Sequence, residues 1–244
     1  MRGFRPRLWP TLLTVPALLV LLGLGTWQVQ RLHWKEALIA ERQAGLAAPA
    51  TDWTEATEGP GELLWHRVSA EGRFLHDSEL LLAARSMNGN PGYHIVTPFE
   101  LGNGSVLLID RGWVPLERKE PQARAEGQVE GTRTISGILR PGHRPSWLTP
   151  DNQPERNFWF WMDLPAMAGS ADLEQRAVTE AYLEADAAPN PGGFPIGGQT
   201  RTDLPNDHLQ YAITWYALAL ALSVIYILYH RAPDGRAERS EAKS

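Results

Sequence analysis

Residues 206–231, NDHLQYAITWYALALALSVIYILYHR, contain a long apolar run with a histidine at its front edge. No residue between Leu209 and Tyr229 is charged, and at about 1.5 Å of helix rise per residue the run is about 31 Å long. That length matches the roughly 30 Å hydrocarbon core of a bilayer, so the stretch predicts a transmembrane helix over 209–229. His208 stands where this helix enters the bilayer, and a metal-competent imidazole at such a place is a candidate functional group.

A second uncharged run covers residues 8–27, LWPTLLTVPALLVLLGLGTW, and predicts a transmembrane helix over 8–28. A cleaved signal peptide is the alternative, because basic residues precede the run. The run is longer than a usual signal sequence, however, and no small-x-small cleavage site follows it. We therefore expect an uncleaved helix that is kinked at Pro16 and continues past the membrane to about Arg42.

The distribution of basic residues predicts how the chain crosses the membrane. Lys and Arg near helix ends favour the cytoplasmic side, and both the N-terminal tail 1–7 and the C-terminal tail 230–244 are rich in them. We expect both termini in the cytoplasm of a bacterium, two passes through its inner membrane, and a periplasmic segment 29–207. The residues that carry this prediction are Arg2, Arg5, Arg7, Arg231, Arg236, Arg239 and Lys243.

Composition excludes several classes of protein. The net charge of −5 and the lack of a basic stripe argue against nucleic acid as a partner. The chain has no cysteine, so thiolate zinc sites, thiol copper sites and covalent haem attachment through C-x-x-C-H are impossible. The lipid bilayer is the partner that the composition indicates.

The central segment has the pattern of a β-rich domain. Short apolar or alternating runs are separated by Gly, Pro, Asn and Asp turns, which is typical of antiparallel sheets that close into a barrel or pack as a sandwich. Asp163 is expected to cap a short helix over 165–168. The predicted fold class is therefore an α+β membrane protein in which two transmembrane helices flank an antiparallel, barrel- or sandwich-like extracytoplasmic domain. The expected strands are 65–74, 79–85, 93–101, 106–114, 133–140, 157–162 and 178–185.

Five segments, in this order and between the two apolar runs, carry a resemblance to a known family. They are LGTWQVQRLHWK (24–35), GYHIVTPFEL (92–101), DRGWVP (110–115), NFWFWMDLPAMA (157–168) and GGQTRTDLPNDHLQYAITWYALALA (197–221). The chain resembles the Surfeit locus protein 1 family of cytochrome c oxidase assembly factors over nearly its whole length. It departs from the family's usual asparagine pair before the histidine, because Asp207 follows Asn206 here.

The resemblance implies a role in assembly and no catalysis. Bacterial members of the family are similar to haem a-binding proteins that assist cofactor insertion into subunit I of the oxidase. The implied cofactor is therefore non-covalent haem a, and the implied partners are subunit I and the haem a synthase. The alternative is a scaffold that stabilises an oxidase intermediate without touching cofactor.

His208 is the residue that the resemblance singles out as the axial ligand of the haem iron. Helical spacing places His208, Tyr211 and Trp215 in one stripe, with Ala212 and Ala219 as small gaps between them. A porphyrin needs an axial nitrogen and flat apolar walls, which this stripe offers. The alternative is that Tyr and Trp only mark the membrane interface and that the histidine lies among headgroups.

Trp27, Gln28 and Arg31 form the matching set on the first helix. If the helices are neighbours, Trp27 lies at the depth of His208, and Arg31 lies about one turn above, where it could pair with a haem propionate. An interfacial tryptophan and a solvated arginine are the alternative. Gly23 and Gly25 could serve close helix packing or make room for a ring.

The remaining polar motifs predict structure more than chemistry. Asp110 and Arg111 end a strand, where such neighbours form local hydrogen bonds; a contact surface for an oxidase subunit is the alternative. Tyr93 and His94 are expected at a strand start and in the core, and the lip of a pocket is the alternative. The run His76–Asp77–Ser78–Glu79 lacks the motif of a hydrolase.

Overall fold

The computed structural model describes residues 6–53, 59–200 and 204–231. It divides into a helical unit, Met1–Ala40 with Asp203–Ser244, and a second unit, Glu41–Thr202. Most of the basic residues on which the predicted orientation rests, including Arg2, Arg5 and Arg236, lie outside the described residues, so the orientation stays a prediction.

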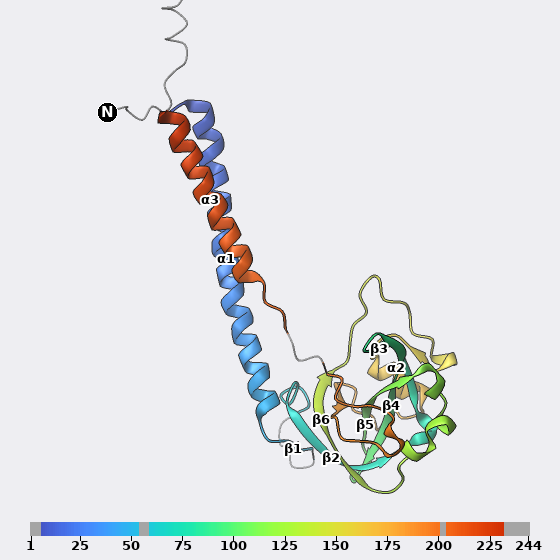
Figure 1. Cartoon of the computed structure of the whole chain (residues 1–244). Helices are drawn as coiled ribbons and strands as arrows, with labels where there is room; N and C mark the ends of the chain where they lie inside the picture. The colour runs from blue at the N-terminus through green and yellow to red at the C-terminus, as the bar shows by residue number, and fades with distance from the viewer. Residues whose placement is uncertain (1–5, 54–58, 201–203, 232–244) are drawn as a thin grey trace, which may run out of the picture. The chain divides into compact units, whose positions relative to one another are not determined.

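Two long helices form the helical unit. α1 is Leu8–Ala47 and α3 is His208–Arg231, and they lie side by side in opposite directions (Figure 1). Both are long and apolar enough to cross a membrane. α1 is one helix that ends at Ala47, a little beyond the expected end near Arg42, and it contains Pro16.

The two helices meet along a seam with a heptad-like spacing. The less exposed residues of each helix recur at alternating intervals of three and four, the spacing that lets antiparallel helices pack along their length. Thr11 and Tyr226 join the seam through hydroxyl groups 2.6 Å apart, and the Lys35 ammonium donates to the Pro205 carbonyl. The seam consists of Thr11, Thr14, Leu18, Leu21, Gly25, Gln28, Leu32 and Lys35 on α1, and of His208, Ala212, Trp215, Ala219, Leu222 and Tyr226 on α3.

The second unit is a closed β-barrel, which confirms the barrel and excludes the sandwich. β2 pairs with β6 on one side and with β4 on the other, so β2, β6, β8, β5 and β4 close on themselves. The pairings of β5 with β8, β1 with β2 and β3 with β7 are parallel, and the others are antiparallel as expected. The strands are β1 Thr51–Asp52, β2 Arg67–Phe74, β3 Leu80–Met87, β4 Asn90–Leu101, β5 Val106–Pro115, β6 Arg133–Pro141, β7 Phe158–Trp159 and β8 Ala181–Ala185.

Two apolar cores flank the central strand β5, which is buried on both faces. Leu107 and Ile109 point into the barrel with Val68, Phe99 and Leu183. Leu108 points outward into a second core that contains Trp159, Met162, Leu164 and Met167. The short helix α2, Leu164–Ser170, covers this second core. The expected strand 157–162 is reduced to β7 because its end turns to feed that helix.

Short helices connect the strands, and one expected cap is present. The Ala166 amide donates to the Asp163 carboxylate at 3.3 Å, so Asp163 caps α2 as predicted. The 3-10 helices, which were not expected, are η1 His76–Ser78, η2 Leu116–Arg118, η3 Pro121–Gly127, η4 Pro154–Arg156 and η5 Pro191–Gly193.

Barrel closure predicts an unusually sensitive glycine. Gly72 pairs with Leu101 of β4 and with Arg133 of β6, and a Cβ there would lie 2.2 Å from the Glu100 carbonyl oxygen. We expect Gly72→Ala to lower the free energy of unfolding by about 1–3 kcal/mol, the usual cost of overpacking, measured by thermal melting of the full chain in detergent. Gly102→Ala is the control, because no atom lies within 4 Å of its added Cβ. Equal melting temperatures for the two variants would contradict this closure.

Candidate functional site

A hydrogen bond between the two membrane helices fixes the imidazole of His208. Its Nδ1 lies 2.7 Å from the Gln28 Oε1, so Nδ1 carries the proton and donates it to the amide oxygen. Gln28 is buried in the seam and His208 is half-buried. In the described part of the chain no hydrogen bond engages Nε2, which keeps the lone pair that a metal ion requires.

The other predicted residues on α1 and α3 share one flank of the seam. Thr26 and Tyr216 are hydrogen-bonded at 3.1 Å, and this pair defines the opposite flank. At about 100° of rotation per residue, Trp27 and Arg31 lie on the other side of the α1 seam from Thr26, and Tyr211 lies on the other side of the α3 seam from Tyr216. Trp27, Arg31 and Tyr211 therefore face outward on the same side of the helix pair.

The outward-facing flank is aromatic and carries one cation. The exposed fraction is 50% for Trp27 and 55% for Tyr211, and the Arg31 guanidinium lies 4.4 Å from the Trp34 ring centroid. Trp215 is half-buried in the seam and lies on neither flank. The predicted residues thus fall into two groups. His208, Gln28 and Trp215 lie in the seam, and Trp27, Arg31 and Tyr211 lie on the open flank.

The small residues do not leave a slot between the helices. Ala212 and Ala219 are buried in the helix contact, and a Cβ on Gly25 would lie 2.8 Å from the Tyr216 ring. Of the two expectations for Gly25, close helix packing is correct. The alternative, room for a ring at Gly25, is wrong because the Tyr216 ring fills that space, whereas a Cβ on Gly23 would meet no atom within 4 Å.

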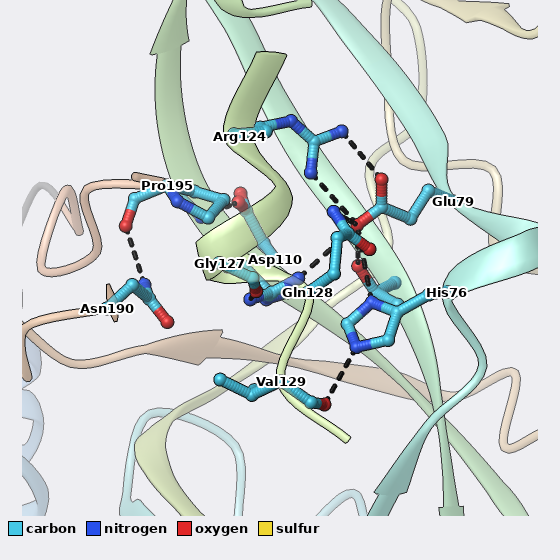
Figure 2. A network of polar contacts seen from close by, with 12 residues as sticks. His76, Glu79, Asp110, Arg124, Gly127, Gln128, Val129, Asn190 and Pro195 are labelled. Atoms are coloured by element: carbon cyan, nitrogen blue, oxygen red, sulfur yellow. Dashed lines mark hydrogen bonds and ion pairs between the residues drawn. The ribbon is translucent and has the colours of Figure 1, made fainter. Parts of the chain in front are cut away.

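The barrel holds a buried charge network that sequence reasoning missed. The Arg124 guanidinium donates to both carboxylate oxygens of Glu79, at 3.1 and 2.6 Å, and Arg111 donates to one of them at 3.3 Å. The Gln128 amide donates to the same oxygen at 3.2 Å, and Figure 2 shows Arg124 and Gln128 converging on Glu79 with His76 beside them. The elements involved are far apart in sequence, so only the adjacency of Asp110 and Arg111 was visible beforehand.

The charges in this network hold the carboxylate ionised. Burial alone would raise the pKa of Glu79, but the contact with His76 and the hydrogen bonds and charges of Arg124 and Arg111 lower it from 4.5 to about 2. Burial lowers the pKa of Arg111 to about 10, so that side chain stays charged at neutral pH. Glu79 is thus an acceptor fixed by cations and is unsuited to take up a proton as a catalytic base.

A second polar cluster lines a pocket of about 540 Å³ on the barrel. The His94 Nδ1 lies 2.8 Å from an Asp110 carboxylate oxygen, and the Gly112 amide donates to Asp110 at 3.0 Å. The latter is the local hydrogen bond expected of this motif, while the long-range contact with His94 was not expected. The same pocket is lined by an ion pair of Arg140 and Glu184, 2.8 Å apart.

Comparison with known proteins identifies the family of the chain. The SURF1 family model matches residues 15–220, which include most of α1, the whole barrel and the first part of α3. A SURF1-like protein of Monosiga brevicollis is 36% identical over 94% of this chain and 90% of its own length. The chain belongs to the SURF1 family. Human Surfeit locus protein 1 is also 36% identical, over 84% of this chain and 72% of its own length, and the Drosophila melanogaster SURF1-like protein is 34% identical over 88% and 75%.

Membership of the SURF1 family confirms the resemblance and leaves the finer predictions open. The relatives named above come from eukaryotes, so they do not test the predicted bacterial inner membrane. Neither the family match nor the relatives' names assign a role to His208, Gln28 or Arg31. Those assignments, and haem a as the cofactor, stay predictions.

The charge network predicts how stability depends on pH. Because the folded-state pKa of Glu79 is depressed, its contribution is fully present above pH 4.5 and is lost as the pH falls toward 2. At about 1.4 kcal/mol per pKa unit, the loss is about 3 kcal/mol. Melting of the full chain in detergent at pH 7 and pH 3 measures the part that is already lost at pH 3, which is about 2 kcal/mol.

Removing this carboxylate should be costly at neutral pH. Glu79→Gln leaves Arg111 and Arg124 buried without their counter-charge, so we expect a loss of about 3–5 kcal/mol and a weaker acid sensitivity below pH 4.5. The matched control is Glu100→Gln, whose partners Arg73 and Arg176 are exposed. Equal melting temperatures of the Glu79 and Glu100 variants at pH 7 would show that the network does not stabilise the barrel.

Proposed function

We propose that this SURF1 family member is an assembly factor for cytochrome c oxidase that holds haem a on its helix pair and assists the insertion of that cofactor into subunit I. The observation that carries the proposal is the hydrogen bond from His208 to Gln28. It lies at the edge of a charge-free helix, where an iron ligand would be reached from the bilayer.

The chemistry of the donor set fits haem a. A metal-bound histidine generally donates its second ring N–H to an oxygen acceptor, which fixes the tautomer and the orientation of the ring. The Gln28 oxygen is that acceptor, and the Nε2 of His208 is the nitrogen left for the iron. A porphyrin supplies four nitrogen ligands itself, so one imidazole from the protein is sufficient to hold it axially.

The open flank suits the remainder of the cofactor. Trp27 and Tyr211 offer exposed aromatic surface beside His208, and the Arg31 guanidinium is a cation suited to a propionate. Because the seam itself is filled, these residues would hold a ring from the outside of the helix pair. An open, non-covalent site with one axial ligand also allows release, which a transfer factor requires.

The proposal extends to location and partners. In a bacterium, both tails would lie in the cytoplasm and the barrel in the periplasm; in a mitochondrion, the tails would lie in the matrix and the barrel in the intermembrane space. There the barrel would contact subunit I and the haem a synthase. The role proposed is one of binding and transfer, without catalysis.

The direct test is the haem spectrum of the purified protein. We expect the full chain, expressed in a host that makes haem a and purified in detergent, to show a Soret band that His208→Ala abolishes or shifts. His33→Ala is the matched control, since His33 is an exposed histidine on α1. An unchanged spectrum for His208→Ala would exclude the axial role. Colourless protein that still co-purifies with subunit I would favour a scaffold that binds no cofactor.

The partner of the imidazole gives a second test. Gln28→Leu removes the acceptor for Nδ1–H while keeping an apolar seam residue of similar size, so we expect haem a to be retained about 10–100-fold more weakly, with the axial ligand unchanged. Haem transfer to apomyoglobin measures the retention, and the spectrum reports the ligand. Gln30→Leu, a polar residue on the exposed side of α1, should leave the retention unaltered. Equal retention by the Gln28 and Gln30 variants would remove Gln28 from the site.

A further inference from the structure

One turn of the barrel unit presents two large apolar side chains to solvent. The exposed fraction is 91% for Trp147 and 71% for Leu148, and Trp147 is the most exposed large apolar residue in the described part of the chain. The turn lies in the loop between β6 and η4. Single exposed apolar residues are ordinary on protein surfaces, but an adjacent Trp–Leu pair at the tip of a turn is typical of a docking element.

Hydrogen bonds hold this turn in one conformation. The Thr149 amide donates to the Ser146 carbonyl at 3.0 Å, and the Ser146 amide donates to the Thr149 hydroxyl at 3.0 Å. The hydroxyl groups of Ser146 and Thr149 are 2.9 Å apart. Pro145 and Pro150 flank the turn. The two apolar side chains are therefore presented on a preformed support, which reduces the entropy lost when they bind.

The base of the loop lies where the chain leaves the barrel for the second membrane helix. The His143 amide donates to the Met162 carbonyl at 3.0 Å, and His143 lines the same pocket as Gly198, Gln199 and Thr200. His208, the first residue of α3, follows Thr200 by only eight positions. Eight residues of extended chain span at most about 28 Å, so the covalent chain sets an upper limit on the distance between Thr200 and His208.

We propose that the turn of Ser146, Trp147, Leu148 and Thr149 docks on the surface of the lipid bilayer that α1 and α3 cross. The indole of Trp147 suits the interface, because its ring is apolar and its N–H can reach a headgroup oxygen. Leu148 adds apolar surface at the acyl boundary. Arg144, exposed at the start of the loop, supplies a cation that suits lipid phosphate.

Tethering makes a small contact sufficient for this docking. Two side chains bind a membrane weakly when free in solution, but here they belong to a chain whose helices are anchored in the same bilayer, so the contact forms at a high effective concentration. The docked turn would restrict the orientation of the barrel above the membrane. This inference is independent of haem binding and of His208.

The absence of cysteine from the chain permits a clean test. Leu148→Cys, labelled with a nitroxide in the full chain, retains Trp147 and places one probe in the turn. Thr132→Cys is the matched control, because it is exposed just before β6, at the other end of the strand from the loop. Both proteins are reconstituted in nanodiscs of phosphatidylcholine and phosphatidylglycerol, and the accessibility of the label to oxygen and to a water-soluble nickel chelate is measured.

We expect the label at 148 to show a several-fold higher ratio of oxygen to nickel accessibility than the label at 132. Adding Trp147→Ser to the Leu148→Cys protein should bring the two ratios together, while the melting temperature stays unchanged because the side chain is exposed. Equal ratios in the presence of Trp147 would overturn the proposal. A label that remains aqueous in nanodiscs and is immobilised only when purified oxidase is added would also overturn it, in favour of a protein partner.

Discussion

The hydrogen bond between Gln28 and His208 sets the register of the helix pair. A polar side chain buried between two apolar helices must find a partner inside the protein, because lipid offers none. Each of these two residues satisfies the other, and the seam on either side then falls into its three-and-four spacing. The same bond decides which nitrogen of the imidazole is free. Packing of the membrane unit and the chemistry proposed for it therefore share one contact.

The barrel depends on buried ion pairs between a carboxylate and two guanidinium groups. Its apolar cores account for compactness, but Glu79 joins elements that the sheet alone would not hold together. Arg111 comes from β5, Arg124 from η3, and Glu79 itself stands before β3. A network of this type is costly to break and resists rearrangement, because each cation would be left buried without its counter-charge. It fixes the long connection that follows β5 against the barrel.

The sequence was sufficient to predict features that depend on local pattern. Apolar runs of bilayer length located both long helices, and alternating apolar and polar residues between turns located most of the strands. The capping role of Asp163 at α2 was also predicted. Strand order, the parallel pairing of β5 with β8 and the charge network could not be predicted, because they join residues far apart in the chain. At the candidate site, depth and composition were predictable. The division between seam and flank was not, since it depends on which side of α3 meets α1.

The antiparallel helix pair has a consequence for biosynthesis. Ribosomes make the chain from the N-terminus, so α1 is complete long before α3, and the whole barrel is translated between them. Gln28 therefore has no histidine partner until α3 has been made. The imidazole and its acceptor can therefore meet only after α3 has been made, and any site that needs both of them is absent until then.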